Sequence, residues 1–329
     1  MPVLHPDRVL FQDAGQDSAG TSCCEHYAGD ERKLRKAFAL QAELGGAFDV
    51  TADLEDGAAA GEEEPIARLL AGILAEPRPP GHHAGCRVHP VDHPAFRRDL
   101  ELLLAARPAQ LAYITIPKLT CIAQLHQAVK TMESVEQQAD FAARVALQIL
   151  VENEAVIYDL PKIAAHPRVR LISFGQMDFT SSHRGAIPAS AMKSPGQFDH
   201  PLMRRAKLEI SAACHASGKI PTHNPTTDFQ SATQAGEDAL RAHHEFGFLR
   251  MWSIHPNQVR QILAAFRPSH HEVEDASRIL LAAQAAAWGP IADRGLLHDR
   301  ASYRYFWDLL KRAKSAGGDI PQAARQAFF

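Results

Sequence analysis

Short runs of β-branched and other apolar residues recur along the chain. Each run is followed by polar residues and then by a longer segment whose apolar positions have helical spacing. This alternation is typical of βα units that build a parallel sheet. It predicts eight strands, at residues 21–26, 48–54, 85–90, 112–117, 145–151, 169–175, 219–224 and 250–256. It predicts helices between them, at 31–44, 64–74, 94–105, 121–132, 155–165, 201–217 and 232–246.

Eight strands separated by helices predict a (β/α)₈ TIM barrel, an α/β fold. A doubly wound sheet is the alternative, but the sequence has no G-x-G-x-x-G that opens a helix and no G-x-x-x-x-G-K-[ST] phosphate loop. Beyond the last strand the chain continues through further helix-like segments. We therefore predict an N-terminal lead-in at 1–20, a catalytic barrel at 21–290 and a C-terminal helical lid and oligomerisation segment at 291–329.

Composition and charge narrow the possible partners. The 329 residues are 46% hydrophobic, and 35 basic and 38 acidic residues give a formal net charge of -3. Without a Lys/Arg run suited to a phosphate backbone, we expect no nucleic-acid partner. No apolar stretch approaches the roughly 20 residues that span a bilayer, and the five cysteines form no C-x-x-C pair. These features favour a cytoplasmic protein with no membrane partner.

Polar residues stand where the apolar runs stop, which in barrel enzymes is the end of the strands that carries the chemistry. Glu152 and Asp178 follow consecutive strands, so their carboxylates can converge on one rim. Such oxygen ligands suit Mg²⁺, which keeps positions open for water and substrate. Each carboxylate could instead cap a helix or pair with a local arginine. The other strand-end residues are Glu25, His26, Glu55, Asp56, Arg87, His89, Lys118, His223, Asp228 and His255.

Three further interpretations of these residues remain open. Arg87 could bind a carboxylate or a developing oxyanion, or could form a structural ion pair with Glu55 and Asp56. Lys118 could be a Schiff-base nucleophile. A zinc site could form from three histidines on different strands, although no H-x-H or H-E-x-x-H spacing supports one. Its ligands would be His89, His223 and His255.

The order of several segments resembles that in the CitE-like members of the HpcH/HpaI aldolase family, which includes citrate lyase β subunits and malyl-CoA lyases. The segments are RKAFALQAELGGAFDVTADLEDGA, CRVHP, ITIPK, LVENEAV, LISFGQMDF and MWSIHPNQ, and the similarity runs from about Cys23 to Asp299. The resemblance implies a TIM barrel that assembles as a homotrimer or hexamer. It also implies that the protein cleaves or forms a carbon-carbon bond next to a CoA thioester.

The resemblance assigns roles to the rim residues. Glu152 and Asp178 match the two protein ligands of the family's Mg²⁺. Arg87 matches the arginine that steadies the oxygen of the electrophilic carbonyl, and Glu55 and Asp56 match the acidic pair that orients this arginine.

A further catalytic residue is implied in the C-terminal segment. Asp299, in GLLHD, looks like the family aspartate on a lid that reaches an adjacent subunit and handles the proton of the acetyl-CoA methyl group. Three features depart from the family pattern: the first strand ends in CCEHYAGD rather than a Pro-Gly turn, NEAV follows the metal glutamate, and Met177 stands where an acidic residue is frequent. These departures concern the acyl carrier and the substrate.

The hypothesis is a Mg²⁺-dependent carbon-carbon lyase. It would cleave a 3-hydroxy-acyl-CoA thioester, such as citryl-, malyl- or citramalyl-CoA, to an acyl-CoA and a 2-oxo acid such as oxaloacetate. CoA enters as part of the substrate. The substrate would contact Arg87, Lys118 and the turn formed by Gly175, Gln176, Met177 and Asp178. The alternatives are a thioesterase or a CoA-independent hydroxy-keto acid aldolase on the same fold, and a non-catalytic metal- and acyl-binding subunit of a larger lyase complex.

Overall fold

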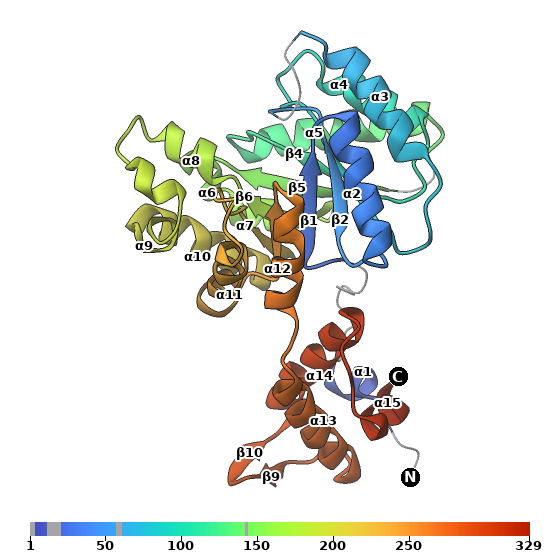
Figure 1. Ribbon diagram of the computed structural model, residues 1–329, viewed down its shortest axis with the longest axis vertical. Coiled ribbons are helices and arrows are strands. Elements are labelled where there is room, and N and C mark those ends of the chain that lie inside the picture. Colours follow the sequence, from blue (N-terminus) through green and yellow to red (C-terminus); the bar gives the residue numbers. More distant parts are fainter. Residues whose placement is uncertain (1–3, 12–20, 57–60, 142–143) are drawn as a thin grey trace. The chain divides into compact units, whose positions relative to one another are not determined.

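The computed structural model describes residues 4–11, 21–56, 61–141 and 144–329. These residues belong to two compact units, whose elements are labelled in Figure 1. The barrel unit comprises Thr21–Phe266, and the helical unit comprises Met1–Gly20 together with Arg267–Phe329.

Eight parallel strands close the barrel in chain order, because β8 pairs with β1. This closed sheet confirms the predicted TIM barrel. The strands are β1 Cys24–Ala28, β2 Asp49–Asp53, β3 Ala84–Arg87, β4 Leu111–Ile116, β5 Ala146–Val151, β6 Val169–Phe174, β7 Ile220–His223 and β8 Arg250–Ser253.

Helices surround the strands, and their apolar faces share one core with the outward-facing strand residues. The predicted helix at 155–165 is two helices, because the chain turns at Tyr158 and Asp159. The sequence pattern did not predict three short helices after β6, which are α8 (Gln176–Ser182), η1 (Ala189–Met192) and α9 (Gly196–Asp199). The barrel-unit helices are α2 Glu31–Glu43, α3 Glu63–Ala75, α4 Phe96–Ala105, α5 Ile122–Gln138, α6 Glu154–Ile157, α7 Leu160–Ala165, α8 Gln176–Ser182, η1 Ala189–Met192, α9 Gly196–Asp199, α10 Pro201–Ala216, α11 Gln234–Phe246 and α12 Pro256–Phe266.

The helical unit has a core of its own, in which Leu10, Leu280 and Trp307 are buried together. Its elements are α1 Pro6–Leu10, α13 His270–Ala285, the hairpin β9 Ile291–Asp293 and β10 Leu296–His298, α14 Arg300–Ser315 and α15 Gln322–Phe328. Contacts divide the chain after Phe266, whereas the sequence pattern led us to expect a division after residue 290. The reason is that α13 packs on α14 and α15. Within the described ranges, no helix is both long and apolar enough to cross a membrane.

The inside of the barrel is charged. Arg250 is fully buried, and its guanidinium donates to Asp49 at 2.6 Å and to Glu25 at 3.3 Å. The hydroxyl of Tyr113 accepts from Arg250 at 2.8 Å and donates to Glu25 at 2.9 Å. The amide of Gln148 donates to the other oxygen of Glu25 at 2.9 Å. Residues from β1, β2, β4, β5 and β8 therefore meet at one buried ionic group.

This network corrects one sequence expectation. We predicted that the first strand ends at His26 and that Glu25 and His26 therefore stand at the rim. The strand instead runs on to Ala28, so Glu25 is the second residue of β1 and lies inside the barrel. His26 is buried as well, and its Nδ1 lies 2.7 Å from the hydroxyl of Ser253.

Replacing Arg250 by Met should lower the free energy of unfolding by about 3–5 kcal/mol, because Glu25 and Asp49 would keep their burial and lose their cation. The matched change Arg260→Met removes a guanidinium that is 57% exposed and paired with Glu43, and should cost less than about 1 kcal/mol. Urea unfolding of both variants measures the difference. Equal losses would contradict a structural role for the buried network.

Candidate active site

Arg87 anchors one side of the rim formed by the carboxyl ends of the strands. It is the last residue of β3 and is 6% exposed. Its Nε and Nη2 each donate to one carboxylate oxygen of Asp53, both at 2.7 Å. Asp53 is the last residue of β2, the neighbouring strand. A bidentate pair of this kind fixes the plane of the guanidinium.

Sequence reasoning missed Asp53, although a signal for it was present. The segment Asp49–Asp53 reads DVTAD, so its polar residues recur at every second position. Alternate residues of a strand share one face. Asp49 and Thr51 both contact residues inside the barrel, which places Asp53 on the inner face as well.

Lys118 and two carboxylates also lie close to Arg87. The Nη1 of Arg87 is 3.1 Å from Glu55 and 3.8 Å from Asp56. The ammonium of Lys118 is 3.0 Å from Asp56 and also contacts Glu55. Glu55 and Asp56 thus lie next to Arg87, as the sequence predicted.

The surroundings of Lys118 count against a Schiff-base role. Although burial acts to lower it, hydrogen bonds to Glu55 and Asp56 raise the pKa of Lys118 above its ordinary value. The side chain is therefore an ammonium at neutral pH. A nucleophilic lysine needs an unprotonated amine, which usually requires a lowered pKa.

Glu152 directly follows β5 and points into the rim. It is 4% exposed, and its Oε2 accepts the backbone N–H of Lys118 at 2.5 Å. Lys118 presents this N–H from a turn in which its φ is 54°, a left-handed conformation that costs energy for a residue with a side chain. Lys118 thus holds Glu152 with its backbone, and it holds Glu55 and Asp56 with its side chain.

Gly175 leaves the space that Glu152 occupies. A Cβ at this position would lie 2.5 Å from Cγ and 2.9 Å from Oε1 of Glu152, closer than real contacts allow. The N–H of Gly175 donates to the carbonyl of Val151 at 2.9 Å, which joins the ends of β5 and β6. Asp178 follows in the first turn of α8.

The electrostatics of Glu152 suit a bound cation. Burial, together with the charge of Asp178, raises the pKa of Glu152 to about 7, against the opposing effect of the Lys118 N–H. Five carboxylates face two cations around the rim, namely Asp53, Glu55, Asp56, Glu152 and Asp178 against Arg87 and Lys118. Carboxylate oxygens are ligands that Mg²⁺ accepts, usually one or two from the protein with water or substrate completing the shell. Glu152 and Asp178 fit this donor set.

The remaining predicted residues of the turn differ in exposure. Gln176 is 1% exposed, and its amide donates to the carbonyl of Met192 at 2.9 Å. Met177 is 49% exposed. Because the N–H of Gly175 is already paired, the free donors of this turn are those of the first residues of α8.

The three-histidine zinc site is wrong. His89 contacts the carboxylate of Asp99 at 2.6 Å, and His223 points to Lys207, also at 2.6 Å. Across the part of the chain that the structure describes, no group of three or more His, Cys, Asp or Glu side chains is arranged to hold a metal ion. The predicted Mg²⁺ site has two protein carboxylates, so it is not a group of this size.

The sequence NEAV, which begins directly after Glu152, has a structural explanation. Asn153 caps α6 by accepting the N–H of Val156 at 3.1 Å, and its amide donates to the carbonyl of Leu119 at 2.7 Å. Glu154 pairs with Arg205 of α10 at 2.8 Å. These two residues fasten the helix that follows Glu152.

Asp299 belongs to the helical unit. It is the N-cap of α14 and accepts the backbone N–H of Ala301 at 2.9 Å. It is also exposed.

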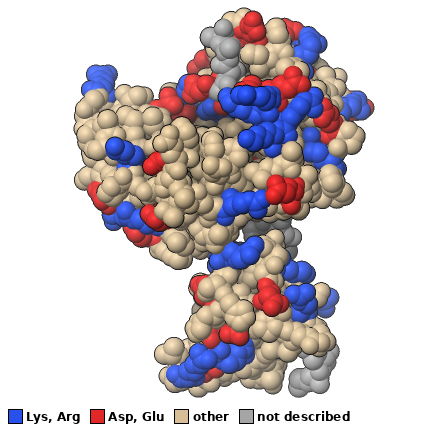
Figure 2. Space-filling view, in the orientation of Figure 1, with Lys and Arg blue, Asp and Glu red and all other residues tan. Residues whose placement is uncertain are grey.

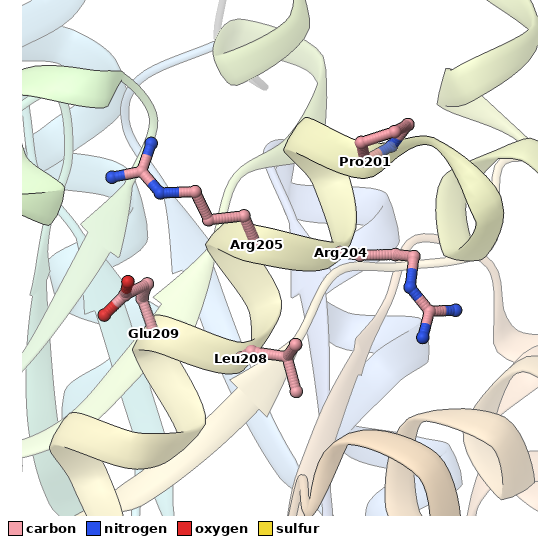
Figure 3. A pocket seen from close by; sticks show the side chains of 5 residues that line it. All are labelled: Pro201, Arg204, Arg205, Leu208 and Glu209. Atoms are coloured by element: carbon pink, nitrogen blue, oxygen red, sulfur yellow. The ribbon is translucent and has the colours of Figure 1, made fainter.

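The surface hollow drawn in Figure 3 is separate from this chemistry. Pro201, Arg204, Arg205, Leu208 and Glu209 line it, all of them on α10. Figure 2 shows charges of both signs spread over the surface, with blue atoms gathered where Figure 1 draws α2. The basic residues of α2 are Arg32, Lys33, Arg35 and Lys36, and all four are exposed.

Comparison with known proteins shows the family. A profile of the HpcH/HpaI aldolase/citrate lyase family matches residues 35–242, which include Arg87, Glu152 and Asp178. The chain is 27% identical over 279 residues to an L-malyl-CoA/beta-methylmalyl-CoA lyase of Rhodobacter capsulatus, with 81% of this chain and 87% of the relative covered. It is 25% identical over 272 residues to a citrate lyase subunit beta-like protein of Mycobacterium tuberculosis, with 81% and 88% covered.

Solved structures give the same result. A citrate lyase from Burkholderia xenovorans LB400 is 45% identical, with a TM-score of 0.85 and coverage of 99% of this chain and 100% of that one. The protein CitE from Mycobacterium tuberculosis, in complex with magnesium, acetoacetate and coenzyme A, has a TM-score of 0.68 at 24% identity. That likeness covers 89% of this chain and 98% of the other, and it shows the shared fold.

Changing Gly175 to Ala should displace Glu152, because the added Cβ overlaps its side chain. We expect Mg²⁺ affinity, measured by calorimetry, to fall by about 10–100-fold, the usual cost of disturbing the support of a metal ligand. Gly236→Ala is the matched control: its Cβ would lie 3.6 Å from the nearest atom, and it should leave the affinity unchanged. Unchanged affinity in Gly175→Ala would contradict the assignment of Glu152.

Proposed function

Because the chain belongs to the HpcH/HpaI aldolase/citrate lyase family, we propose that it is a Mg²⁺-dependent lyase that cleaves a 3-hydroxy-acyl-CoA thioester to an acyl-CoA and a 2-oxo acid. The observation that carries the proposal is the arrangement of the rim. Two carboxylates, Glu152 and Asp178, follow adjacent strands, and a fixed guanidinium stands at the end of β3. Citryl-, malyl- and citramalyl-CoA are the candidate substrates.

The rim residues support this chemistry in distinct ways. Mg²⁺ held by Glu152 and Asp178 would supply a Lewis acid beside the oxygen that becomes the carbonyl. Arg87 has five N–H bonds, and its contacts with Asp53 and Glu55 engage three of its nitrogen donors once each. Donors remain for a substrate oxygen that gains negative charge in the transition state.

The proton balance of the reaction needs a further group. The substrate hydroxyl releases its proton to solvent, the carbon-carbon bond breaks to leave a carbonyl and an enolate, and the enolate takes up one proton to become the acyl-CoA. We assign that last proton to Asp299 of an adjacent subunit in a homotrimer or hexamer. Its exposed position at the start of α14 supports this role, because the carboxylate is open to a partner.

The cations on α2 support a CoA-linked substrate. This helix starts three residues after β1 ends, at the edge of the rim. Lys33 pairs with Asp30, and Arg35 pairs with Glu31 and Glu76. The phosphates of CoA are anions that exposed cations at this edge would attract.

Turnover of the three CoA esters with Mg²⁺ tests the reaction. Glu152→Ala and Asp178→Ala should each lower kcat/KM at least about a hundredfold, since the lost Lewis acid is worth several kcal/mol. EDTA should abolish turnover by wild-type protein. The control Glu154→Ala removes a nearby carboxylate that pairs with Arg205, and it should retain turnover. Full activity in either ligand variant would refute the metal assignment.

The same assay separates the alternatives. Turnover of free hydroxy acids alone would favour a CoA-independent aldolase, and release of free CoA without a 2-oxo acid would favour a thioesterase. A protein that binds Mg²⁺ and oxaloacetate yet turns over no ester would favour a binding subunit of a larger complex. Borohydride trapping at Lys118 would revive the Schiff-base route.

Mixing subunits tests Asp299. Glu152→Ala and Asp299→Ala should each be inactive as pure proteins, since one lacks a metal ligand and the other the proton donor. After the two are dissociated and reassembled together, some sites should combine an intact rim with an intact Asp299, so turnover should return. Absence of recovery in mixed oligomers, verified by mass spectrometry, would place Asp299 within its own subunit's site or outside the reaction.

A further inference from the structure

A second polar cluster lies beside the rim, between α10, α9 and the end of β7. At its centre is Lys207, which is fully buried on the inner face of α10. Arg204, Arg205 and Leu208 lie on the other side of the same helix and line the hollow in Figure 3. Burying a lysine costs free energy, so the hydrogen bonds that Lys207 makes indicate which segments it holds in place.

The partners of Lys207 are neutral. Its Nζ donates to Nε2 of His223 at 2.6 Å and to the amide oxygen of Gln197 at 3.2 Å, and it lies 4.2 Å from the ring centre of Phe198. The Nδ1 of His223 faces the carbonyl of Asn224 at 2.9 Å, so Nδ1 carries the proton and Nε2 accepts. Burial lowers the pKa of both Lys207 and His223. Lys207 therefore joins the end of β7 to α9.

From Gln197 the cluster continues to Asp238 of α11. The amide nitrogen of Gln197 donates to Asp238 at 2.9 Å. Asp238 also accepts from the hydroxyls of Ser194 at 2.5 Å and Thr226 at 2.6 Å. The segment before α9 and the loop after β7 are thus tied to one carboxylate, which is 1% exposed.

The same segment reaches the metal side of the rim. The carbonyl of Met192 accepts from the amide of Gln176 at 2.9 Å and from the hydroxyl of Thr227 at 3.3 Å. Gln176 is the first residue of α8, and Asp178 stands two positions later in the same turn. Met192 is therefore connected to Asp178 through Gln176 and the first turn of α8.

We propose that Lys207 is a positioning residue for Asp178. Together with Gln197 and Asp238 it fixes residues 192–198, and the Met192 carbonyl then holds Gln176 and the first turn of α8. The proposal rests on the proposed function in so far as Asp178 is taken to bind Mg²⁺. Groups that support metal ligands from behind commonly affect metal affinity by about 10–100-fold.

Lys207→Met tests the proposal, because Met keeps the volume of the side chain and removes the donor. We expect Mg²⁺ affinity of the full-length protein, measured by calorimetry well below its melting temperature, to fall about tenfold. The matched control is Arg168→Met, which removes a buried cation paired with Glu136 next to the opposite end of β6. It should lower the melting temperature and leave Mg²⁺ affinity unchanged. Equal affinity losses in both variants would overturn the proposal.

A double variant identifies the route. If Lys207 acts through Gln176, adding Lys207→Met to Gln176→Leu should weaken Mg²⁺ binding no further than Gln176→Leu alone. Additive losses would overturn this route. Thr226→Val, which removes one hydrogen bond to Asp238, serves as a milder variant if Lys207→Met does not fold, and an affinity equal to wild type would then count against the cluster.

Hydrogen exchange in metal-free protein keeps the two proposals distinguishable. Lys207→Met should speed exchange of amides in 175–182 as well as in 189–199, whereas Arg168→Met should leave both segments protected. If wild-type protein binds no Mg²⁺, the metal site fails, and faster exchange at 175–182 still supports the positioning of α8. Unchanged exchange at 175–182 overturns the positioning role whatever the metal result.

Discussion

The guanidinium of Arg250 neutralises charged side chains that would otherwise be costly to bury inside the barrel. It sits on β8, and its partners Asp49 and Glu25 sit on β2 and β1. A barrel exists only if its last strand pairs with its first, and this ionic group spans that closing seam. Burying such a group adds little net stability, but losing one partner is expensive. The charges therefore favour this strand order over other arrangements.

Closure of the barrel gives the rim its geometry. Parallel strands in a closed sheet end on one face, so side chains from distant parts of the sequence converge there. Lys118 then joins two groups of them. Its backbone N–H holds Glu152, while its ammonium holds Glu55 and Asp56, which contact Arg87. Glu152, the proposed metal ligand, and Arg87, the proposed oxyanion-binding group, are thus positioned by one residue with a strained backbone.

The fold was predictable because strand and helix periods alternate clearly along the chain, and all eight predicted strands exist. The polar residues on the inner face of the strands were not predictable from the same pattern. Apolar runs mark buried strands, but the polar residues Glu25, Asp53 and Arg250 are also buried, since each finds an opposite charge inside the barrel or at its rim. Pairing across strands depends on register, which a single sequence does not specify. The short helix α8 was also missed; its first residue, Gln176, donates to the carbonyl of Met192 from a later segment.

The segment NEAV, which begins after Glu152, supports the position of helix α6 rather than the choice of substrate. The polar atoms of Asn153 contact α6 and the Leu119 carbonyl, and the carboxylate of Glu154 pairs with Arg205, so both residues hold α6 in place. Discrimination between acids that differ by a methyl group is worth only about 1–3 kcal/mol and depends on side chains that touch the difference. Met177 is the exposed residue in the turn that carries Asp178. Met177 is neutral, so it would not repel a carboxylate of the substrate as an acidic residue at this position would. The part of the substrate that distinguishes it from related acids is therefore expected to lie near Met177.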